Sequence, residues 1–147
     1  QPLAVEQGCA LVVAGPTSCP VQCDPRRVGR VVRNLVVNAI EYGAGQPVEI
    51  TLAAGDPTTV SVTDHGVGLD SVAAERVFER FWRADPSRRR TLGGTGLGLA
   101  ISREDARLHG GDLTVTATPG AGCRFTLQLP SSPTERGTDP SPSVTPR

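Results

Sequence analysis

The sequence predicts an α+β fold, namely a two-layer α/β sandwich in which helices pack on one face of a mixed, mostly antiparallel sheet. Two long segments carry apolar residues at helical spacing, and several shorter segments alternate apolar and polar residues as half-buried strands do. Gly and Pro separate these segments at short intervals. The chain has 147 residues, of which 37% are hydrophobic and only 3% aromatic, so we expect one core of mainly aliphatic side chains.

Composition and charge argue against several classes of function. The 15 basic residues balance the 15 acidic ones, which disfavours a nucleic-acid binder that relies on a basic surface. No apolar run approaches the roughly 20 residues of a membrane span, and the opening residues are not expected to be a leader peptide. Cys19 and Cys23 lack a second cysteine pair, which favours ordinary thiols over a zinc site. Because the chain contains no Met, we expect it to be part of a longer protein.

The first half of the chain predicts strands, a long helix and a hairpin. Residues 1–23 carry short apolar runs broken by Gly and Pro, which indicate one or two loosely bounded strands. Asp24 is typical of a helix N-cap before Pro, and the apolar spacing that follows predicts a helix over 25–42, stopped by the glycines of GAG. Residues 47–54 and 58–65 alternate and predict an antiparallel hairpin.

The second half predicts two helices, a loop and two strands. A short helix is expected over 71–83, a polar, basic and mobile loop over 84–95, and a second long helix over 96–109 that ends at paired glycines. LTVTAT and CRFTLQL predict the last two strands and complete a domain over residues 1–130. The Pro- and Ser-rich tail 131–147 is expected to be disordered.

The segment NLVVNAIEY places two asparagines on the flank of the predicted first helix. At about 100° per residue, Asn34, Asn38 and Glu41 share a polar strip beside the buried stripe, and Tyr42 lies between the two. A neutral amide oxygen suits Mg²⁺ that also carries phosphate oxygens and water. Hydrogen bonds from both asparagines to solvent or loops are the alternative.

Two glycine-containing segments add candidate ligand contacts. In VTDHGVGLD, Asp64 at a strand end can accept hydrogen bonds from an exocyclic amine, while Gly66 and Gly68 let the backbone approach a planar base. GGTGLGLAI (93–101) leads into a helix whose N-terminus favours phosphate, although it is neither a P-loop nor a dinucleotide fingerprint. An ordinary Asp-x-Gly turn and a flexible linker are the alternatives, but the order of the segments favours one site.

In this order, the segments resemble the boxes of the catalytic ATP-binding domain of sensor histidine kinases, which has the Bergerat (GHKL) ATP-binding fold. NLVVNAIEY resembles the N box, DHGVGL the G1 box, FERF the F box and GGTGLGLAI the G2 box. The resemblance covers about residues 1–130, and FWRADPSRRRTLGGTGLGLAISREDARLHGG is similar in particular to MtrB-type kinases of actinobacteria. The resemblance implies ATP and Mg²⁺ as ligands.

The resemblance implies a role for each matching residue. Asn38 would coordinate Mg²⁺, with Asn34 near the metal and the phosphates. Tyr42 would pack on the adenine, and Asp64 would accept a hydrogen bond from its amino group. The glycines that would shape the base pocket are Gly66 and Gly68.

The phosphates would be held by the glycine-rich loop and the helix that follows it. The residues implied there are Gly94, Thr95, Gly96, Leu97 and Gly98. A lid over about residues 70–95 would be anchored by Phe78 and Phe81. Arg83 would approach the γ-phosphate, where a cation stabilises charge on the transferred group.

The chain also departs from the family pattern. Glu41 stands where the family often has a phosphate-holding Lys, so it would repel ATP or contact the metal. The arginines that could compensate for a loss of ATP affinity are Arg80, Arg83 and those at 88–90. No His with the context of the family's phosphoacceptor is present, since His65 lies in a turn and His109 at a helix end. The chain is therefore expected to bind ATP without phosphorylating itself in the usual way.

Two alternative functions of the same fold can be distinguished by particular residues. ATP-driven clamps such as gyrase, MutL and Hsp90, and also anti-sigma-factor kinases, carry a Glu four residues before the metal-binding Asn, and in the clamps this Glu activates water. Asn34 occupies that position here, which predicts slow ATP hydrolysis. A nucleotide-binding protein-docking module without kinase activity is the other alternative, and Glu41 favours it.

The resemblance further implies the partners of the whole protein. A His on a dimerisation and phosphoacceptor helical hairpin, absent from this chain, would attack the γ-phosphoryl group. A response regulator receiver domain would then take the phosphoryl group onto an Asp. The full-length protein would be a homodimer in the cell membrane, with this domain on the cytoplasmic side and no nucleic-acid partner.

Overall fold

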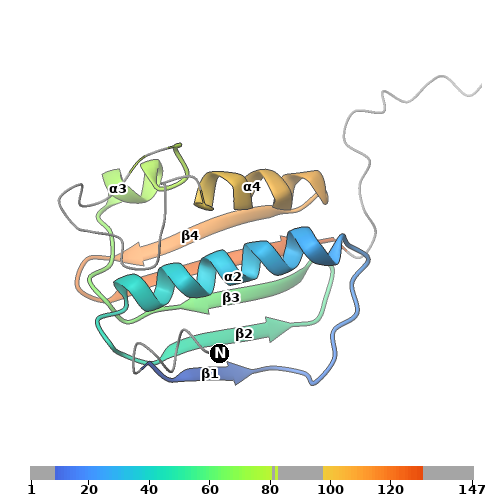
Figure 1. Cartoon of the computed structure of the whole chain (residues 1–147), viewed down its shortest axis with the longest axis horizontal. Helices are drawn as coiled ribbons and strands as arrows, with labels where there is room; N and C mark the ends of the chain where they lie inside the picture. Colours follow the sequence, from blue (N-terminus) through green and yellow to red (C-terminus); the bar gives the residue numbers. More distant parts are fainter. Residues whose placement is uncertain (1–8, 81, 83–97, 131–147) are drawn as a thin grey trace, which may run out of the picture.

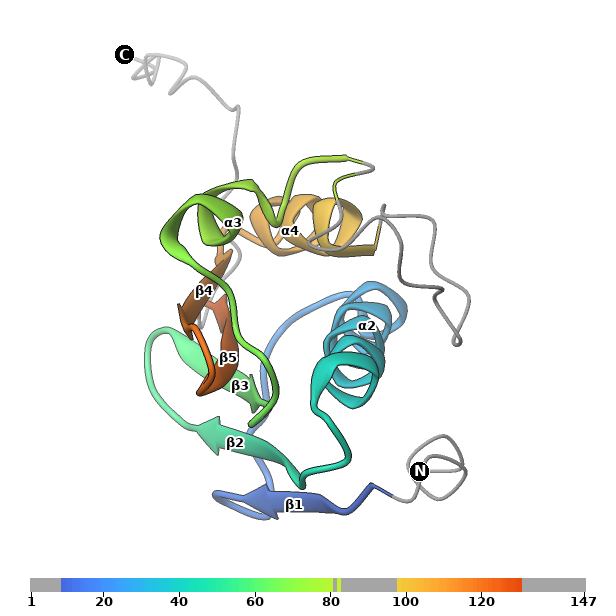
Figure 2. The same cartoon turned by 90° about the vertical axis from the view of Figure 1, so that its left-hand side faces the viewer.

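The structure, a computed structural model, describes residues 9–80, 82 and 98–130 and has two layers (Figures 1 and 2). A five-stranded sheet forms one layer, and α2 and α4 lie across one of its faces. In chain order the elements are β1 (Leu11–Ala14), α2 (Pro25–Tyr42), β2 (Val48–Ala53), β3 (Thr58–Thr63), α3 (Ser71–Arg76), α4 (Gly98–Leu108), β4 (Asp112–Thr118) and β5 (Gly122–Leu129). The predicted α+β two-layer fold is confirmed.

The strand order β1-β2-β3-β5-β4 makes the sheet mixed, because β1 pairs parallel to β2 while the other pairs are antiparallel. The pairing of β3 with β5 sets Thr63 opposite Arg124. It is extended by one hydrogen bond, in which the Asp64 N–H donates to the Cys123 carbonyl oxygen at 2.9 Å. Two segments far apart in the chain thus meet at one end of the central strands.

Helix α2 follows its predicted bounds for reasons that the sequence shows. The Asp24 carboxylate caps the N-terminus by accepting hydrogen bonds from the backbone N–H groups of Arg26 and Arg27, with Pro in the first turn. Val31, Leu35 and Ala39 recur at four-residue spacing and are at most 1% exposed. This stripe packs on the sheet and forms the centre of the core.

Polar contacts fasten α4 to the first turns of α2. The buried Asp105 carboxylate accepts hydrogen bonds from Arg27 at 3.0 Å and Arg30 at 2.7 Å. His109 Nε2 accepts the Asp24 N–H at 3.0 Å, so its proton lies on Nδ1, which is 2.7 Å from the Asp105 carbonyl oxygen. The expected structural or solvent-facing role of His109 is therefore structural.

The predicted helix over 71–83 is too long, because α3 ends at Arg76. Single turns follow it, in which the N–H groups of Glu79 and Trp82 donate to carbonyls three residues earlier. Val77 is 8% exposed, and Phe78 packs edge-to-face on Phe125. Val77 is thus part of the core and Phe78 packs against it, just after the helix ends.

The remaining elements agree with their predictions where the structure describes them. The hairpin and the last two strands are present, and α4 stops at Gly110, whose φ of 77° only glycine adopts readily. The predicted loop 84–95 and tail 131–147 lie outside the described residues. No helix within residues 9–80 and 98–130 is long and apolar enough to cross a membrane.

Gly29→Ala is expected to stabilise the fold. Gly29 lies on the exposed face of α2, and an added Cβ would meet nothing within 4 Å. Alanine gains about 1 kcal/mol over glycine in a helix, which raises the melting temperature by roughly 3 °C for a domain of this size. Circular dichroism would measure it, with Gly45→Ala as the control, since the φ of 75° at Gly45 predicts a lower melting temperature. A decrease for Gly29→Ala would contradict the expectation.

Candidate functional site

An open pocket lies where the end of α2, the loop after β3, the segment after α3 and the start of α4 meet. It encloses about 520 Å³ including its mouth, a size typical of small-ligand sites. Its lining residues are Asn38, Tyr42, Asp64, Val67, Gly68, Leu69, Val77, Trp82, Leu99, Cys123 and Phe125. The pocket thus combines a few polar groups with mostly apolar walls.

Asp64 supplies the carboxylate of the pocket. The residue is only 2% exposed, and its Oδ1 accepts the Gly66 N–H at 2.9 Å. Burial raises the pKa of this carboxyl, although the Gly66 N–H opposes the shift. An acceptor fixed by the backbone against apolar walls is suited to an N–H donor on a flat ligand.

The two glycines after Asp64 are required by close backbone contacts. A Cβ on Gly66 would lie 1.8 Å from the Tyr42 carbonyl oxygen, and one on Gly68 would lie 2.0 Å from the Thr118 carbonyl oxygen. Gly68 also has a φ of 71°. These contacts hold the loop against the end of α2 on one side and the β4–β5 turn on the other.

The polar flank of α2 divides between the pocket and α4. Asn38 and Tyr42, one helical turn apart, both line the pocket. Asn34, one turn earlier, instead donates from Nδ2 to Ser102 Oγ at 3.2 Å. A Cβ on Gly98 would lie 3.8 Å from the Asn34 amide, so Asn34 sits beside the first residue of α4. Its predicted place near the phosphates stays a prediction.

Several predicted residues lie outside the described part of the chain or away from the lining. Outside the described residues are Phe81, Arg83, Gly94, Thr95, Gly96 and Leu97, together with the arginines at 88–90. Glu41 is half-buried on the flank of α2 and is not part of the lining. His65 is exposed, and its Nε2 lies 3.2 Å from Glu49 Oε1, as expected for a solvent-facing residue.

The apolar walls were missed by the reasoning from sequence motifs. Val77, Trp82 and Leu99 come from segments flanking the predicted loop, while Cys123 and Phe125 come from β5. CRFTLQL predicted a strand only, and the structure shows that its alternating residues Cys123 and Phe125 are both buried. Only the pairing of β5 with β3 brings these residues to the end of β3, where the Asp64 N–H donates to the Cys123 carbonyl oxygen.

Cys123 is a protonated thiol in this pocket, because burial and then the nearby Asp64 carboxylate raise its pKa to about 12. Since the thiolate reacts, we expect iodoacetamide to label Cys123 in the native protein far more slowly than Cys19 near pH 8. Its rate should rise about tenfold per pH unit while the pH stays below that pKa. Peptide mass spectrometry would measure both rates, and equal labelling near pH 8 would contradict the expectation.

The side chains in the pocket fit Mg²⁺ only when phosphate accompanies it. The described residues contain no group of three or more His, Cys, Asp or Glu that could hold a metal ion. Asn38 places one amide in the lining. Mg²⁺ commonly keeps water and substrate phosphates as its other ligands, so one protein oxygen is compatible with it.

A two-layer α+β domain with a buried carboxylate, a helix amide and apolar walls in one pocket is suited to bind a nucleotide. Residues 23–133 match the family described as "Histidine kinase-, DNA gyrase B-, and HSP90-like ATPase". The chain belongs to this family.

Curated relatives agree with this assignment. The chain is 52% identical over 130 residues to "Sensor histidine kinase MtrB" of Mycobacterium tuberculosis (strain ATCC 25618 / H37Rv), covering 87% of this chain. It is 41% identical over 111 residues to "Signal transduction histidine-protein kinase AfsQ2" of Streptomyces coelicolor, covering 75% of this chain. The chain spans only 23% and 20% of the length of these two relatives.

Solved structures give the same result. Full-length ShkA in complex with AMPPNP matches with a TM-score of 0.77 and 29% identity, covering 90% of this chain and 28% of that one. The mycobacterial sensor histidine kinase MprB matches with a TM-score of 0.70 and 30% identity, covering 90% of this chain and 89% of that one. The predicted resemblance is confirmed: the chain has the fold of the ATP-binding catalytic domain of sensor histidine kinases.

Proposed function

We propose that this domain binds Mg-ATP in the pocket and presents the γ-phosphoryl group to a His on the phosphoacceptor hairpin of a longer kinase. The observation that carries the proposal is the union of Asp64, Asn38 and Tyr42 in one pocket with apolar walls. A purine base needs a flat apolar slot and a polar group at its edge, and this pocket offers both.

The base is recognised through Asp64. Because Asp64 Oδ1 already accepts the Gly66 N–H, the carboxylate is held in one orientation and can take the adenine amino group. Tyr42 and Phe125 both line the pocket and supply apolar surface for the base. Guanine carries a carbonyl at the corresponding position, so the same carboxylate would repel it.

The metal and the phosphates are held toward α4. Asn38 coordinates Mg²⁺ through its amide oxygen, and the ion when bound neutralises phosphate charge. Gly98 opens α4, whose N-terminus favours anions, and Asn34 beside it supports that end through Ser102. The proposed phosphate contacts in the preceding loop are Gly94, Thr95, Gly96 and Leu97, with Arg83 on the γ-phosphate.

The domain is suited to phosphoryl transfer rather than hydrolysis. Asn34, at the position where the clamps carry a water-activating Glu, is an amide that donates to Ser102 and cannot act as a general base. ATP held here therefore persists until an acceptor imidazole attacks. The phosphoryl group then passes to an Asp of a receiver domain.

The wider assembly follows from the kinds of relatives. The chain spans about a quarter or less of MtrB and AfsQ2, which supports a longer protein, and we infer that it contains a dimerising phosphoacceptor hairpin and acts on a response regulator. The whole protein would be a homodimer anchored in the cell membrane, with this domain on its cytoplasmic side.

Calorimetric titration with Mg²⁺ and AMPPNP tests binding, and transfer from radiolabelled ATP to a separately produced phosphoacceptor hairpin tests catalysis. Micromolar to sub-millimolar binding with label on the hairpin His supports the kinase. Binding without label would instead identify a docking module of the same fold. No binding, or steady ATP turnover near about 1 s⁻¹, would overturn the proposal.

A further inference from the structure

Arg103 of α4 occupies an unusual position between a carboxylate and an aromatic ring. Its guanidinium carbon lies 4.6 Å from the centre of the Phe78 ring, within the range of a cation–π contact. On its other side, Arg103 Nε donates to Asp112 Oδ1 at 3.4 Å. The Arg103 side chain is only 32% exposed, so both contacts are partly shielded from water.

The ring that Arg103 covers leads directly to the pocket. Phe78 packs edge-to-face on Phe125, with ring centres 6.1 Å apart and planes at 89°. Phe125 lines the pocket, as do Val77, next to Phe78, and Trp82 one turn further on. The contacts from Asp112 through Arg103 and Phe78 to Phe125 are continuous, which we call the Arg103 bridge.

Asp112 is suited to hold the arginine in place. Burial works to raise the pKa of its carboxyl, but hydrogen bonds from the Leu113 N–H and Arg103 outweigh that effect, and the pKa is lowered. The carboxylate is therefore charged at neutral pH. Asp112 begins β4 and is paired across the sheet with Gln128, so the sheet fixes the anchor of the bridge.

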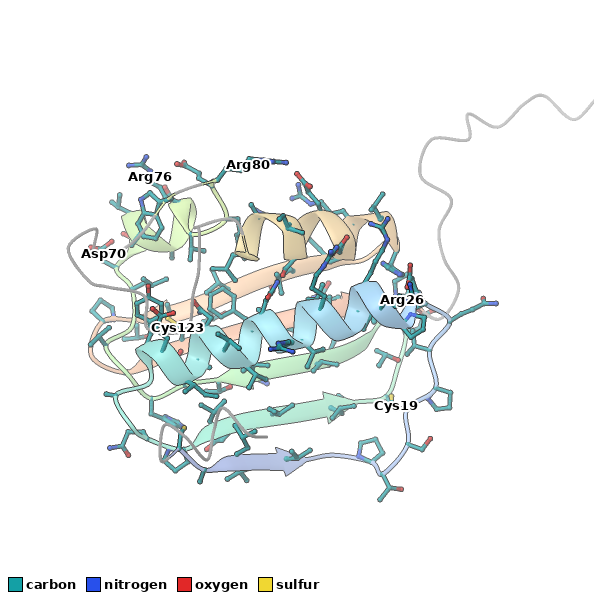
Figure 3. The ribbon with its side chains drawn as sticks, viewed as in Figure 1. Cys19, Arg26, Asp70, Arg76, Arg80 and Cys123 are labelled. Carbon is teal, nitrogen blue, oxygen red and sulfur yellow. The ribbon has the colours of Figure 1, made fainter. Side chains whose placement is uncertain are left out.

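A second contact also joins the segment after α3 to α4, but its side chains are more exposed to solvent. Arg80 extends toward α4 (Figure 3) and forms an ion pair with Glu104 at 2.6 Å. Both side chains are more than half exposed, and such surface pairs contribute little. The Arg103 bridge is thus the better shielded of these two contacts between α4 and the segment after α3.

We propose that Arg103 is a positioning residue for the nucleotide pocket. It holds Phe78 against Phe125, and it thereby keeps the walls formed by Val77 and Trp82 at the right distance from Asp64. The Arg103 guanidinium reaches this wall through the Phe78 ring, which in turn packs on Phe125. Its effect on nucleotide affinity rests on the proposed function, whereas its effect on the position of Trp82 does not.

The chain offers a matched control and a built-in probe. Arg107, also on α4, donates to the same Asp112 oxygen at 3.3 Å but has no ring contact among the described residues. Trp82 is the sole Trp of the sequence, so intrinsic fluorescence reports on one pocket wall. A purely structural role of the α4 cations would affect Arg103 and Arg107 alike.

The experiment compares Arg103→Gln, Arg103→Lys and Arg107→Gln by Trp82 emission and by affinity for Mg-AMPPNP. We expect Arg103→Gln to red-shift the emission of the unliganded protein and to weaken binding about fivefold to tenfold. Arg103→Lys should stay close to the parent in both Trp82 emission and nucleotide affinity, since it keeps the cation. Arg107→Gln should match the parent in emission and bind within about twofold.

A double-mutant cycle with Phe78→Leu completes the test. In that background the ring is gone, so Arg103→Gln should change neither emission nor affinity further. The proposed role of Arg103 would be overturned by either of two results. One is an equal effect of Arg103→Gln and Arg107→Gln, and the other is an undiminished effect of Arg103→Gln in the Phe78→Leu background. A parent that binds no nucleotide would refute the proposed function alone, because the unliganded emission still decides the role of Arg103.

Discussion

Asp64→Asn should weaken the binding of adenine nucleotide about 100-fold, because the amide replaces an acceptor by a donor at the edge of the base. The oxygen of the new side-chain amide would accept the hydrogen bond from the Gly66 N–H, as Asp64 Oδ1 does now. Its NH₂ group would then face the adenine amino group. A lost charge-assisted bond together with an unsatisfied donor amounts to about 3 kcal/mol. Calorimetric titration with Mg-AMPPNP would measure the loss.

A matched control separates this loss from a general effect of charge. Glu49→Gln removes a carboxylate that contacts the neighbouring His65 on the surface and should bind within about twofold of the parent. The parent should also prefer ATP to GTP, and Asp64→Asn should reduce that preference. Retained affinity and unchanged preference in Asp64→Asn would show that the base is recognised elsewhere.

The same substitution should stabilise the unliganded fold at neutral pH. Because the pKa of Asp64 is raised in the folded protein, the folded state binds more protons than the unfolded state between the two pKa values. The contribution of this group to stability therefore falls as the pH rises from about 4 through the folded pKa. Asn does not ionise, so Asp64→Asn should melt at a higher temperature than the parent at pH 7, and nearer to it at acidic pH.

Gly66→Ala should cost about 3 kcal/mol or more of folding free energy, because the new Cβ has no room. It would lie 1.8 Å from the Tyr42 carbonyl oxygen and 2.9 Å from the Gly43 Cα, and both of these are backbone atoms. The loop must then move from the end of α2, taking with it the N–H that orients Asp64. Urea unfolding would measure the stability, and nucleotide titration the site.

Gly29→Ala is the matched comparison for Gly66→Ala. It makes the same chemical change where the added methyl group meets nothing within 4 Å, and its expected effect on stability has the opposite sign. Similar unfolding midpoints for the two variants would mean that the loop after β3 can relax, and that the close approach to Tyr42 does not constrain the pocket.

Local patterns explain why much of the molecule could be predicted from the sequence. The cap at Asp24 and the four-residue spacing of Val31, Leu35 and Ala39 defined α2, since a helix is built from neighbours in the chain. The alternation in β2 and β3 defined their hairpin for the same reason. The order of the Asn-, Asp- and Gly-containing segments predicted the family, which the comparisons confirm.

Other features depend on contacts between distant segments. The helix expected over 71–83 ends at Arg76, and Phe78 just beyond it packs on Phe125 of β5. No local sequence pattern could predict this contact, because the two residues are far apart in the chain. The flank of α2 predicted one polar strip, yet Asn34 turns to Ser102 while Asn38 enters the pocket lining. Which neighbour each side chain meets is decided by how α4 packs on α2.

The sequence by itself thus determined the long helix α2, the strands and the chemical groups available for a nucleotide, because these follow from short-range periodicity and residue type. Only the tertiary structure decided how those groups converge. The antiparallel pairing of β3 with β5 brings Cys123 and Phe125 into the pocket that Asp64 lines, and the segment after α3 adds Val77 and Trp82 to the same lining. Such convergence depends on burying one shared core, and its energy is summed over the whole chain rather than over any segment.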